Sequence, residues 1–272
     1  MFDLTGSASQ PTEGIDVVLR IHSPPDIASL DRALFSLVHQ SYHPVHPIIV
    51  TQNLTFDQRD HVEKTALDHD WQFEHMTPTI IHYRVDQGVD ARSRLLNVGV
   101  RNARLRFFAV LDYDDYLYEY AYQYLIDKLK TQNATIAFGG IVVSYVHDLT
   151  FYQYKIREFH DKYVGHGIDD LFIDNFCPIH SFVLDRHKIA VEDMIFEEGI
   201  ARLEDYDFFL RICSKYQPYF ESRVKKIGVY NWQLGGTNLD ASGSPIAHED
   251  DPAWLHARQH IEGLKSRLRA AS

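Results

Sequence analysis

Three acidic residues follow a short apolar segment in the middle of the chain. Residues 107–111 are Phe, Phe, Ala, Val and Leu, and Asp112, Asp114 and Asp115 come directly after them. Phenylalanine and valine favour a buried strand, and open α/β sheets place ligands at the carboxyl ends of parallel strands. Carboxylates this close repel one another unless a cation lies between them, and their oxygens suit Mg²⁺ or Mn²⁺. The pattern predicts either a metal-dependent site or an acidic, solvated turn.

A second acidic group, made of Glu204, Asp205 and Asp207, stands where a helix is predicted to begin. Acids in a first helical turn gain about 0.3–1 kcal/mol from the helix dipole, which is the purely structural interpretation. Three acids in four residues exceed what the dipole requires. A carboxylate at the mouth of a cleft is suited to act as a general base, so a catalytic interpretation also stands.

Basic residues mark the start of another predicted helix, which begins near Asp90 and carries Arg92 and Arg94 in its first turns. Free N–H groups and guanidinium groups converge there and suit an anion. An exposed basic helix face is the alternative. Glycine in mid-helix costs about 1 kcal/mol relative to alanine, so Gly99 predicts that this helix packs closely on the sheet.

Polar residues also end the first two predicted strands. Gln52 and Asn53 close the second strand, at the sheet edge where a nucleobase would lie, and Arg20 is near the end of the first. A side-chain amide both donates and accepts hydrogen bonds, so recognition of a base is one interpretation. A turn-forming asparagine is the other.

The elements that must position these residues alternate along the first half of the chain. Strands are predicted at residues 15–21, 47–51, 80–84 and 107–111, and helices at 28–39, 55–68 and 90–103. Such alternation predicts an α/β fold with a mostly parallel, twisted sheet, right-handed crossovers and flanking helices.

The second half has a more irregular pattern. Helices are predicted at residues 119–132, 203–216 and 252–269, and strands at 135–146, 151–156, 181–184 and 226–233. Residues 159–174 are predicted to form a mobile loop and 235–249 another loop. The second half is therefore expected to be a smaller, mixed layer.

Composition narrows the classes of partner. The chain has 272 residues and a formal net charge of −11, which argues against a protein that coats nucleic acid or an anionic membrane. An anionic small substrate would need a metal ion or a few arginines. The two cysteines, Cys177 and Cys213, fit neither a disulfide framework nor zinc spacing, as expected of a cytosolic protein. No segment approaches the roughly 20 apolar residues of a membrane-spanning helix.

Five segments in order carry a resemblance to a known family. They are VVLR with a following proline, ALFSLVHQSY, RSRLLNVGVRNA, FFAVLDYDD and FEEGIARLEDYDFFLRI. Together they resemble the family 2 inverting glycosyltransferases, which have the GT-A fold. The resemblance covers residues 15–233 and implies one domain, with a nucleotide-binding half (15–115) and an acceptor half (116–233). Residues 1–14 are then expected to be a loose leader, and 234–272 a loop and a terminal amphipathic helix.

The resemblance also implies roles for single residues. Asp205 would be the catalytic base, and Asp114, with Asp112, would hold a divalent metal, Mn²⁺ or Mg²⁺, while Asp112 also faces the donor ribose. The remaining residues are expected to line the two substrate sites: Arg20, Gln52, Asn53, Arg92 and Arg94 on the donor side, and Glu204 and His180 on the acceptor side.

The implied activity is metal-dependent, inverting transfer of a sugar from a nucleotide-diphospho-sugar to a hydroxyl of a glycan or glycolipid, in bacterial surface polysaccharide or lipopolysaccharide synthesis. Many members carry Asp-Asp after the second strand, where Gln52 and Asn53 stand here, so the uridine preference of the family is not implied. The Gln-x-x-Arg-Trp segment and membrane helices of processive members are missing. A soluble, non-processive enzyme follows, in the cytoplasm or at the inner face of the membrane, alone or in a multi-enzyme assembly.

Two other functions fit parts of the pattern. A strand ending in Asp-x-Asp also resembles the phosphatases that form an aspartyl phosphate, although those place it on their first strand. The other alternative is a module that binds nucleotide-sugar or glycan without turnover. The acidic residues Asp112, Asp114, Glu204 and Asp205 argue against lost catalysis.

Overall fold

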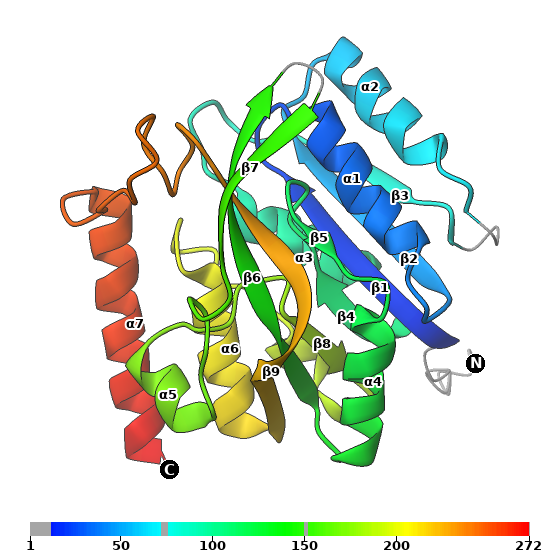
Figure 1. The fold of residues 1–272 in the computed structure, drawn as a ribbon. Helices are drawn as coiled ribbons and strands as arrows, with labels where there is room; N and C mark the ends of the chain where they lie inside the picture. The colour runs from blue at the N-terminus through cyan, green and yellow to red at the C-terminus, as the bar shows by residue number, and fades with distance from the viewer. Residues whose placement is uncertain (1–11, 72–75, 150–151, 272) are drawn as a thin grey trace, which may run out of the picture.

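The first half of the chain alternates strands and helices, as predicted. The structure is a computed structural model that describes residues 12–71, 76–149 and 152–271. In order it forms β1 (Thr12–Ile21), α1 (Ile27–Val38), β2 (Val45–Gln52), α2 (Phe56–Leu67), β3 (Thr79–Tyr83), α3 (Arg92–Asn102) and β4 (Leu105–Val110) (Figure 1). Residues 12–14, assigned above to a leader, lie in β1; residues 1–11 of that leader lie outside the described part.

Local signals in the sequence explain where the first helices begin. The Asp26 carboxylate accepts a hydrogen bond of 2.8 Å from the backbone N–H of Ser29, which caps α1. Thr55 and Gln58 form a reciprocal capping box at the start of α2. Each cap satisfies N–H groups that have no partner inside the helix.

The second half adds shorter helices and longer strands. Its elements are β5 (Tyr116–Leu117), α4 (Ala121–Thr131), β6 (Ile136–Leu149), β7 (Tyr152–Phe159), α5 (Ile168–Ile173), β8 (Phe182–Asp185), α6 (Glu204–Lys215), β9 (Pro218–Gln233) and α7 (Pro252–Ala271), with two short 3₁₀ helices, Arg186–Lys188 and Val191–Asp193. The segment predicted as a mobile loop contains α5. Strand β9 extends eight residues further toward the N-terminus than predicted, and β5 was not predicted.

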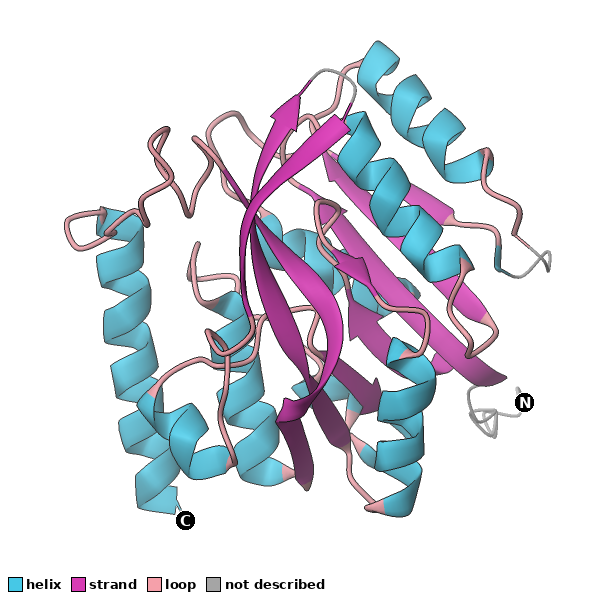
Figure 2. Cartoon of the chain, viewed as in Figure 1, coloured by secondary structure: helices cyan, strands magenta, loops and turns pink. Residues whose placement is uncertain are grey.

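One sheet of nine strands runs through the described part of the chain, in the order β3-β2-β1-β4-β8-β6-β9-β5, with β7 paired to β6. Strands β1 to β4 are parallel to one another. Beyond β4 the pairing is mixed, because β8 and β7 are antiparallel to their neighbours whereas β9 is parallel to β6. Figure 2 shows the long, twisted strands of this mixed part. The predicted α/β fold is confirmed, and its mixed half continues the same sheet.

Two apolar cores lie on the two faces of the sheet. One collects side chains from α1, α2 and α4, and the other collects side chains from α3, α6 and α7. Gly99 of α3 faces Val18 of β1 so closely that an added Cβ would lie 2.5 Å from both Val18 methyl groups. The close packing predicted from this glycine is therefore present.

The chain order reverses at β1, whose neighbours are β2 on one side and β4 on the other. In open α/β sheets a crevice forms outside the carboxyl ends of the strands at such a reversal. Arg20 at the end of β1 and Asp112 after β4 both lie there.

Candidate active site

Two adjoining cavities, each of about 550 Å³, open at this crevice. The first cavity is lined by Ser23, Asp26, Asp114 and Asn231, among others. The second cavity is lined by residues of α6 and of the segment that leads into α7. Both share Arg20, Arg92, Asp112 and Tyr230. The two cavities are therefore halves of one cleft.

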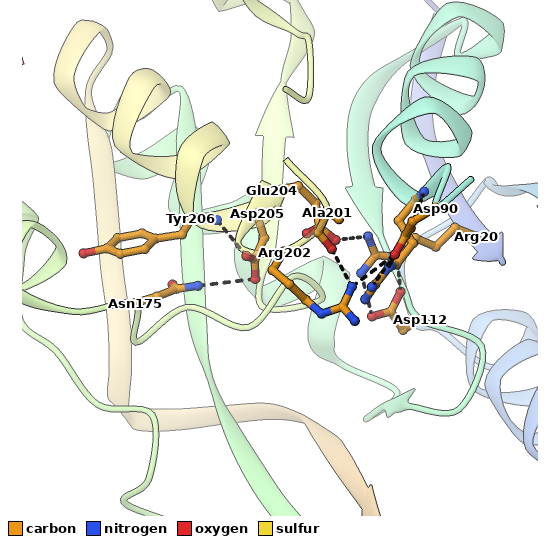
Figure 3. Close-up of polar contacts among 10 residues, drawn as sticks. Arg20, Asp90, Asp112, Asn175, Ala201, Arg202, Glu204, Asp205 and Tyr206 are labelled. Carbon is orange, nitrogen blue, oxygen red and sulfur yellow. Dashed lines mark hydrogen bonds and ion pairs between the residues drawn. The ribbon is translucent and has the colours of Figure 1, made fainter. Parts of the chain in front are cut away.

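Arg20 lies at the junction of the two halves and is only 8% exposed. Its Nε and Nη2 atoms lie 2.9 and 3.3 Å from the two carboxylate oxygens of Asp112, and its Nη1 atom donates to Oε1 of Glu204 (Figure 3). Burial would raise the pKa of Asp112, but the charge and hydrogen bonds of Arg20 bring it below its ordinary value. Asp112 is thus ionised, and β1 is linked to the start of α6.

Asp114 lines the first cavity and has a different environment. Burial and the neighbouring Asp112 carboxylate raise the pKa of Asp114 to about 7. It has no ion pair with any residue in the described part of the chain. Its negative charge is therefore left without a partner inside the cleft.

Asp115 lines neither cavity. It is fully buried, and its Oδ1 accepts a hydrogen bond of 2.8 Å from the backbone N–H of Asn231 on β9. Burial, Asp114 and Asp112 raise the pKa of Asp115 well above its ordinary value. Of the three acids, Asp115 fastens the acidic turn to the sheet, and Asp112 and Asp114 line the cleft.

The donor set around Asp114 fits a divalent metal only in part. No group of three or more His, Cys, Asp or Glu side chains among the described residues could hold a metal ion. Asp112 and Asp114 nevertheless line the same cavity. Mg²⁺ characteristically takes one or two carboxylates and completes its shell with water and substrate phosphate. The arrangement therefore fits a metal that binds together with a phosphate ligand.

The three acids of α6 point to three different partners. Glu204 is bound to Arg20, whereas Asp205 accepts hydrogen bonds from the Tyr206 N–H at 2.7 Å and the Asn175 amide at 3.3 Å (Figure 3). Asp207 is buried and is held by Arg211 and His260. Only Glu204 and Asp205 line the second cavity.

Asp205 has the electrostatic properties of a general base. Burial, followed by the charge of Glu204, raises the pKa of Asp205 to about 7. A carboxylate whose pKa lies close to neutral pH can accept a proton during a reaction and release it afterwards. The left-handed conformation of Leu203, with φ of 60°, sets the direction in which α6 enters the cleft.

The two arginines of α3 have different positions. Arg92 lines both cavities, and its Nη2 lies 2.6 Å from Oδ2 of Asp90. Nη1 of Arg202 lies 3.1 Å from the same oxygen (Figure 3). Arg94 is 45% exposed, pairs with Glu198 and lines neither cavity. The structure therefore brings Arg92 to the cleft and leaves Arg94 outside it, and adds Arg202, which the sequence did not indicate.

Gln52 and Asn53 use their amides within the fold. Gln52 donates to the carbonyl of Val89 and accepts from the N–H of Ala91, while Asn53 makes a reciprocal pair of 3.0 Å hydrogen bonds with the backbone of Val85. Asn53 has φ of 50°, as in a turn. Neither residue lines the two cavities. They hold the segment that leads to Arg92, which agrees with the turn-forming alternative.

His180 lies in the second cavity, on the same side as Asp205. Burial lowers the pKa of His180 to about 4, so the ring is neutral. Its Nδ1 lies 3.2 Å from Oδ2 of Asp115, but neither ring nitrogen has a hydrogen-bond partner in the described part of the protein. A buried polar ring without partners is unusual and suits a site that takes a ligand.

Aromatic residues complete the second cavity, and sequence patterns did not identify them. Tyr163, Tyr230, His248 and Trp254 line it, and three of the four come from segments predicted as loops or from the start of α7. The sequence offered one indication of them, because Trp254 stands in the first turn of a predicted amphipathic helix. In the described residues no helix is long and apolar enough to cross a membrane.

The chain is similar in sequence to one protein family and in fold to several solved structures. Residues 26–191 match the sequence profile of glycosyl transferase family 2. No curated protein sequence matches the chain. Similar solved structures include residues 1–349 of S. aureus TarS in complex with UDP-GlcNAc, at 12% identity and a TM-score of 0.62, covering 92% of this chain and 66% of that one.

A second structure of TarS 1–349 has a TM-score of 0.59 at 12% identity and covers 80% of this chain; the present chain spans 60% of its length. The mannosyltransferase PcManGT from Pyrobaculum calidifontis, in complex with GDP-Man and Mn²⁺, has a TM-score of 0.56 at 11% identity, with 97% and 66% of the two chains covered. At such identities the likeness establishes the fold, which is of the GT-A type.

Proposed function

The chain belongs to glycosyl transferase family 2, and from this premise we propose that it transfers a sugar, with inversion, from a nucleotide-diphospho-sugar to a hydroxyl group. The first cavity takes the donor and the second cavity takes the acceptor. One observation carries the proposal: Asp112 and Asp114 line one half of a cleft whose other half presents Asp205, a carboxylate with a pKa of about 7.

The reaction is a single displacement at the anomeric carbon. The acceptor oxygen attacks this carbon, its bond to the donor phosphate oxygen breaks, and the nucleoside diphosphate leaves with the electron pair. Asp205 accepts the proton of the attacking hydroxyl. One base on the acceptor side suffices for this route, which is why inversion is proposed.

Donor binding combines the carboxylates and arginines of the cleft. Asp112, fixed by Arg20, would accept hydrogen bonds from the ribose, and Arg92, which lines both halves of the cleft, would donate hydrogen bonds to the diphosphate. Asp114 and Asp112 would hold Mn²⁺ or Mg²⁺, which when bound offsets the charge that grows on the diphosphate. PcManGT was solved with GDP-Man and Mn²⁺, and TarS with UDP-GlcNAc, which supports these ligands as first probes.

The competing possibility is a module that binds donor without turnover. Asp205 argues against it, because a binding module has no need of a carboxylate with a pKa near 7 in its second cavity. The wider role, in bacterial surface polysaccharide or lipopolysaccharide synthesis at the inner face of the membrane, rests on the family resemblance alone.

The first test measures release of nucleoside diphosphate from UDP-GlcNAc and GDP-mannose with Mn²⁺ present, with water as the default acceptor. We expect Asp205→Asn to lower turnover by about 10²–10⁴-fold, the usual contribution of a general base, while diphosphate affinity is unchanged. Asp169→Asn is the matched control, since Asp169 is an exposed acid in the first turn of α5. Wild-type turnover in a folded Asp205→Asn protein would remove Asp205 as the base.

A further inference from the structure

Part of the second cavity is formed by a segment outside the region that matches the family profile, which ends at residue 191. The rings of His248 and Trp254 stack with centroids 4.8 Å apart and planes 10° from parallel. Nε2 of His248 lies 3.0 Å from the carbonyl oxygen of Thr237, which fixes the stack to the preceding loop. The stacked rings of His248 and Trp254 line the second cavity, where they can contact a ligand.

Further rings line the same cavity. Tyr163 and Tyr230 lie with centroids 6.0 Å apart, and His180 meets Tyr230 edge-on at 5.6 Å. Aromatic rings offer flat apolar surface with polar edges, and the C–H face of a pyranose ring matches that surface. The unpartnered nitrogens of the buried His180 add a hydrogen-bonding group for a hydroxyl. These observations point to a sugar ring in this half of the cleft.

The charges that line the second cavity are unbalanced. Asp174, Asp205 and Asp251 line it, and none of them forms an ion pair with a described residue. In the described part of the chain they accept hydrogen bonds from neutral backbone N–H and amide groups, as in the 2.8 Å hydrogen bonds that Asp174 and Asp251 accept. Uncompensated carboxylates repel an anionic ligand.

The cations that line the cavity are already paired. Arg20 is held by Asp112 and Glu204, and Arg92 and Arg202 share Asp90. Arg258 lies 5.8 Å from the Trp254 ring but lines a neighbouring cavity. An anionic acceptor would therefore meet no free cation among the described residues that line this half.

We propose that the second cavity binds the acceptor as a sugar unit without negative charge, and discriminates against acceptors that carry a phosphate or carboxylate there. The sugar packs against the aromatic rings while the carboxylates accept hydrogen bonds from its hydroxyls. This inference rests on the proposed function, because it assigns the chemistry of the acceptor to the same cleft.

The test compares sugars that differ in charge. Methyl glucoside and methyl glucosaminide are titrated beside methyl glucuronide and glucose 6-phosphate, and binding is followed by ligand-observed NMR. Each titration is run with and without UDP and Mg²⁺. We expect methyl glucoside and methyl glucosaminide to bind at least about tenfold more tightly than methyl glucuronide and glucose 6-phosphate. The reason is that repulsion between one negative charge and two partly exposed carboxylates weakens binding by about that factor.

The variant Asp174→Asn/Asp251→Asn identifies the cause. Asparagine keeps the shape and the hydrogen-bond acceptor at both positions, including the cap-like contact of Asp251 with Ala253. We expect the preference for uncharged sugars to fall about tenfold in this variant and to persist in Asp250→Asn, a neighbouring exposed acid that does not line the cavity.

Two results would overturn the inference. One is equal or tighter binding of the anionic sugars by the wild-type protein. The other is a preference that the double variant leaves unchanged. Failure of UDP and GDP to bind would count against the proposed function instead, and because the sugar titrations are also run without nucleotide, the two failures are distinguishable.

Discussion

At the scale of single residues, Asp205 should set the pH dependence of activity. Its pKa is raised from 3.8 to about 7 by burial and then by Glu204, and a base works only when deprotonated. The value of kcat/KM should therefore fall about tenfold per pH unit below pH 7 and level off above it. A pH–rate profile of donor turnover measures this; a flat profile from pH 5 to 8 would contradict it.

The same pKa has an opposite effect on stability. Because the folded-state pKa of Asp205 lies above its ordinary value, the folded protein binds the proton more tightly, and its free energy of unfolding falls as pH rises from about 4 to 7. Asp205→Asn should therefore melt at a higher temperature than wild type at pH 8, with a difference that shrinks toward pH 4. Thermal melts at several pH values check the sign.

Arg92 and Arg94 provide a matched pair on one helix. Arg92 and Arg202 share Asp90, and of the two only Arg92 lines the first cavity. We expect Arg92→Gln to weaken nucleoside diphosphate binding by about tenfold, in line with the loss of a charge-assisted hydrogen bond, with nucleoside binding unaffected. Arg94→Gln should change neither. Calorimetric titration of the diphosphate into each variant measures this. A larger loss of affinity in Arg94→Gln than in Arg92→Gln would contradict the assignment of Arg92 to the cleft.

The sequence could identify the acids of the site but could not choose between these arginines. Asp112 and Asp114 follow an apolar strand directly, so their location at the sheet edge follows from chain order. Residues two apart on a helix do not share a face, so only one of Arg92 and Arg94 can face the cleft. Which one does so depends on the rotation of α3, which is set by the contact of Gly99 with Val18.

At the scale of elements, that contact makes Gly99 a test of how α3 is positioned. Gly99→Ala gains about 1 kcal/mol of helix propensity but forces a Cβ to within 2.5 Å of both methyl groups of the buried Val18. Overpacking of this kind costs about 1–3 kcal/mol, so we expect net destabilisation, with a melting temperature lowered by about 2–4 °C per kcal/mol.

Gly263→Ala is the control for this prediction. Gly263 lies in α7, and an added Cβ would approach only the end of the flexible Arg267 side chain, at 3.4 Å. Without a clash, the helix propensity should raise the melting temperature. Equal stabilisation by both substitutions would mean that α3 is not held against β1 as described.

The helices and strands were predictable where the local sequence pattern favours the same structure that the tertiary contacts require. The buried strands β1, β2 and β4 and the capped helices α1 and α2 follow from apolar runs and capping residues. The first half of β9 was missed because residues 218–225 are mixed in character, and Val224 is 80% exposed. The pairing of β9 along β6, which is a long-range contact, forms that strand. His248 and Trp254 were missed as site residues because the tertiary fold, and no local pattern, brings them to the second cavity.

At the scale of the whole molecule, the negative charge bears on how a diphosphate binds. The net charge is −11, and the arginines that line the cleft are paired with Asp90, Asp112 and Glu204. The described residues therefore offer little free positive charge to an anionic donor. A divalent cation at Asp114, whose charge lacks a partner, would supply it.

The measurement that tests this central claim most directly is calorimetric titration of UDP and GDP into the protein with Mn²⁺ and with EDTA. The account predicts that at least one diphosphate binds with Mn²⁺ present, that chelation weakens its affinity at least about tenfold, and that Asp114→Asn removes the difference while Asp250→Asn retains it. Equal diphosphate affinity with and without the metal ion in the wild-type protein would contradict the account.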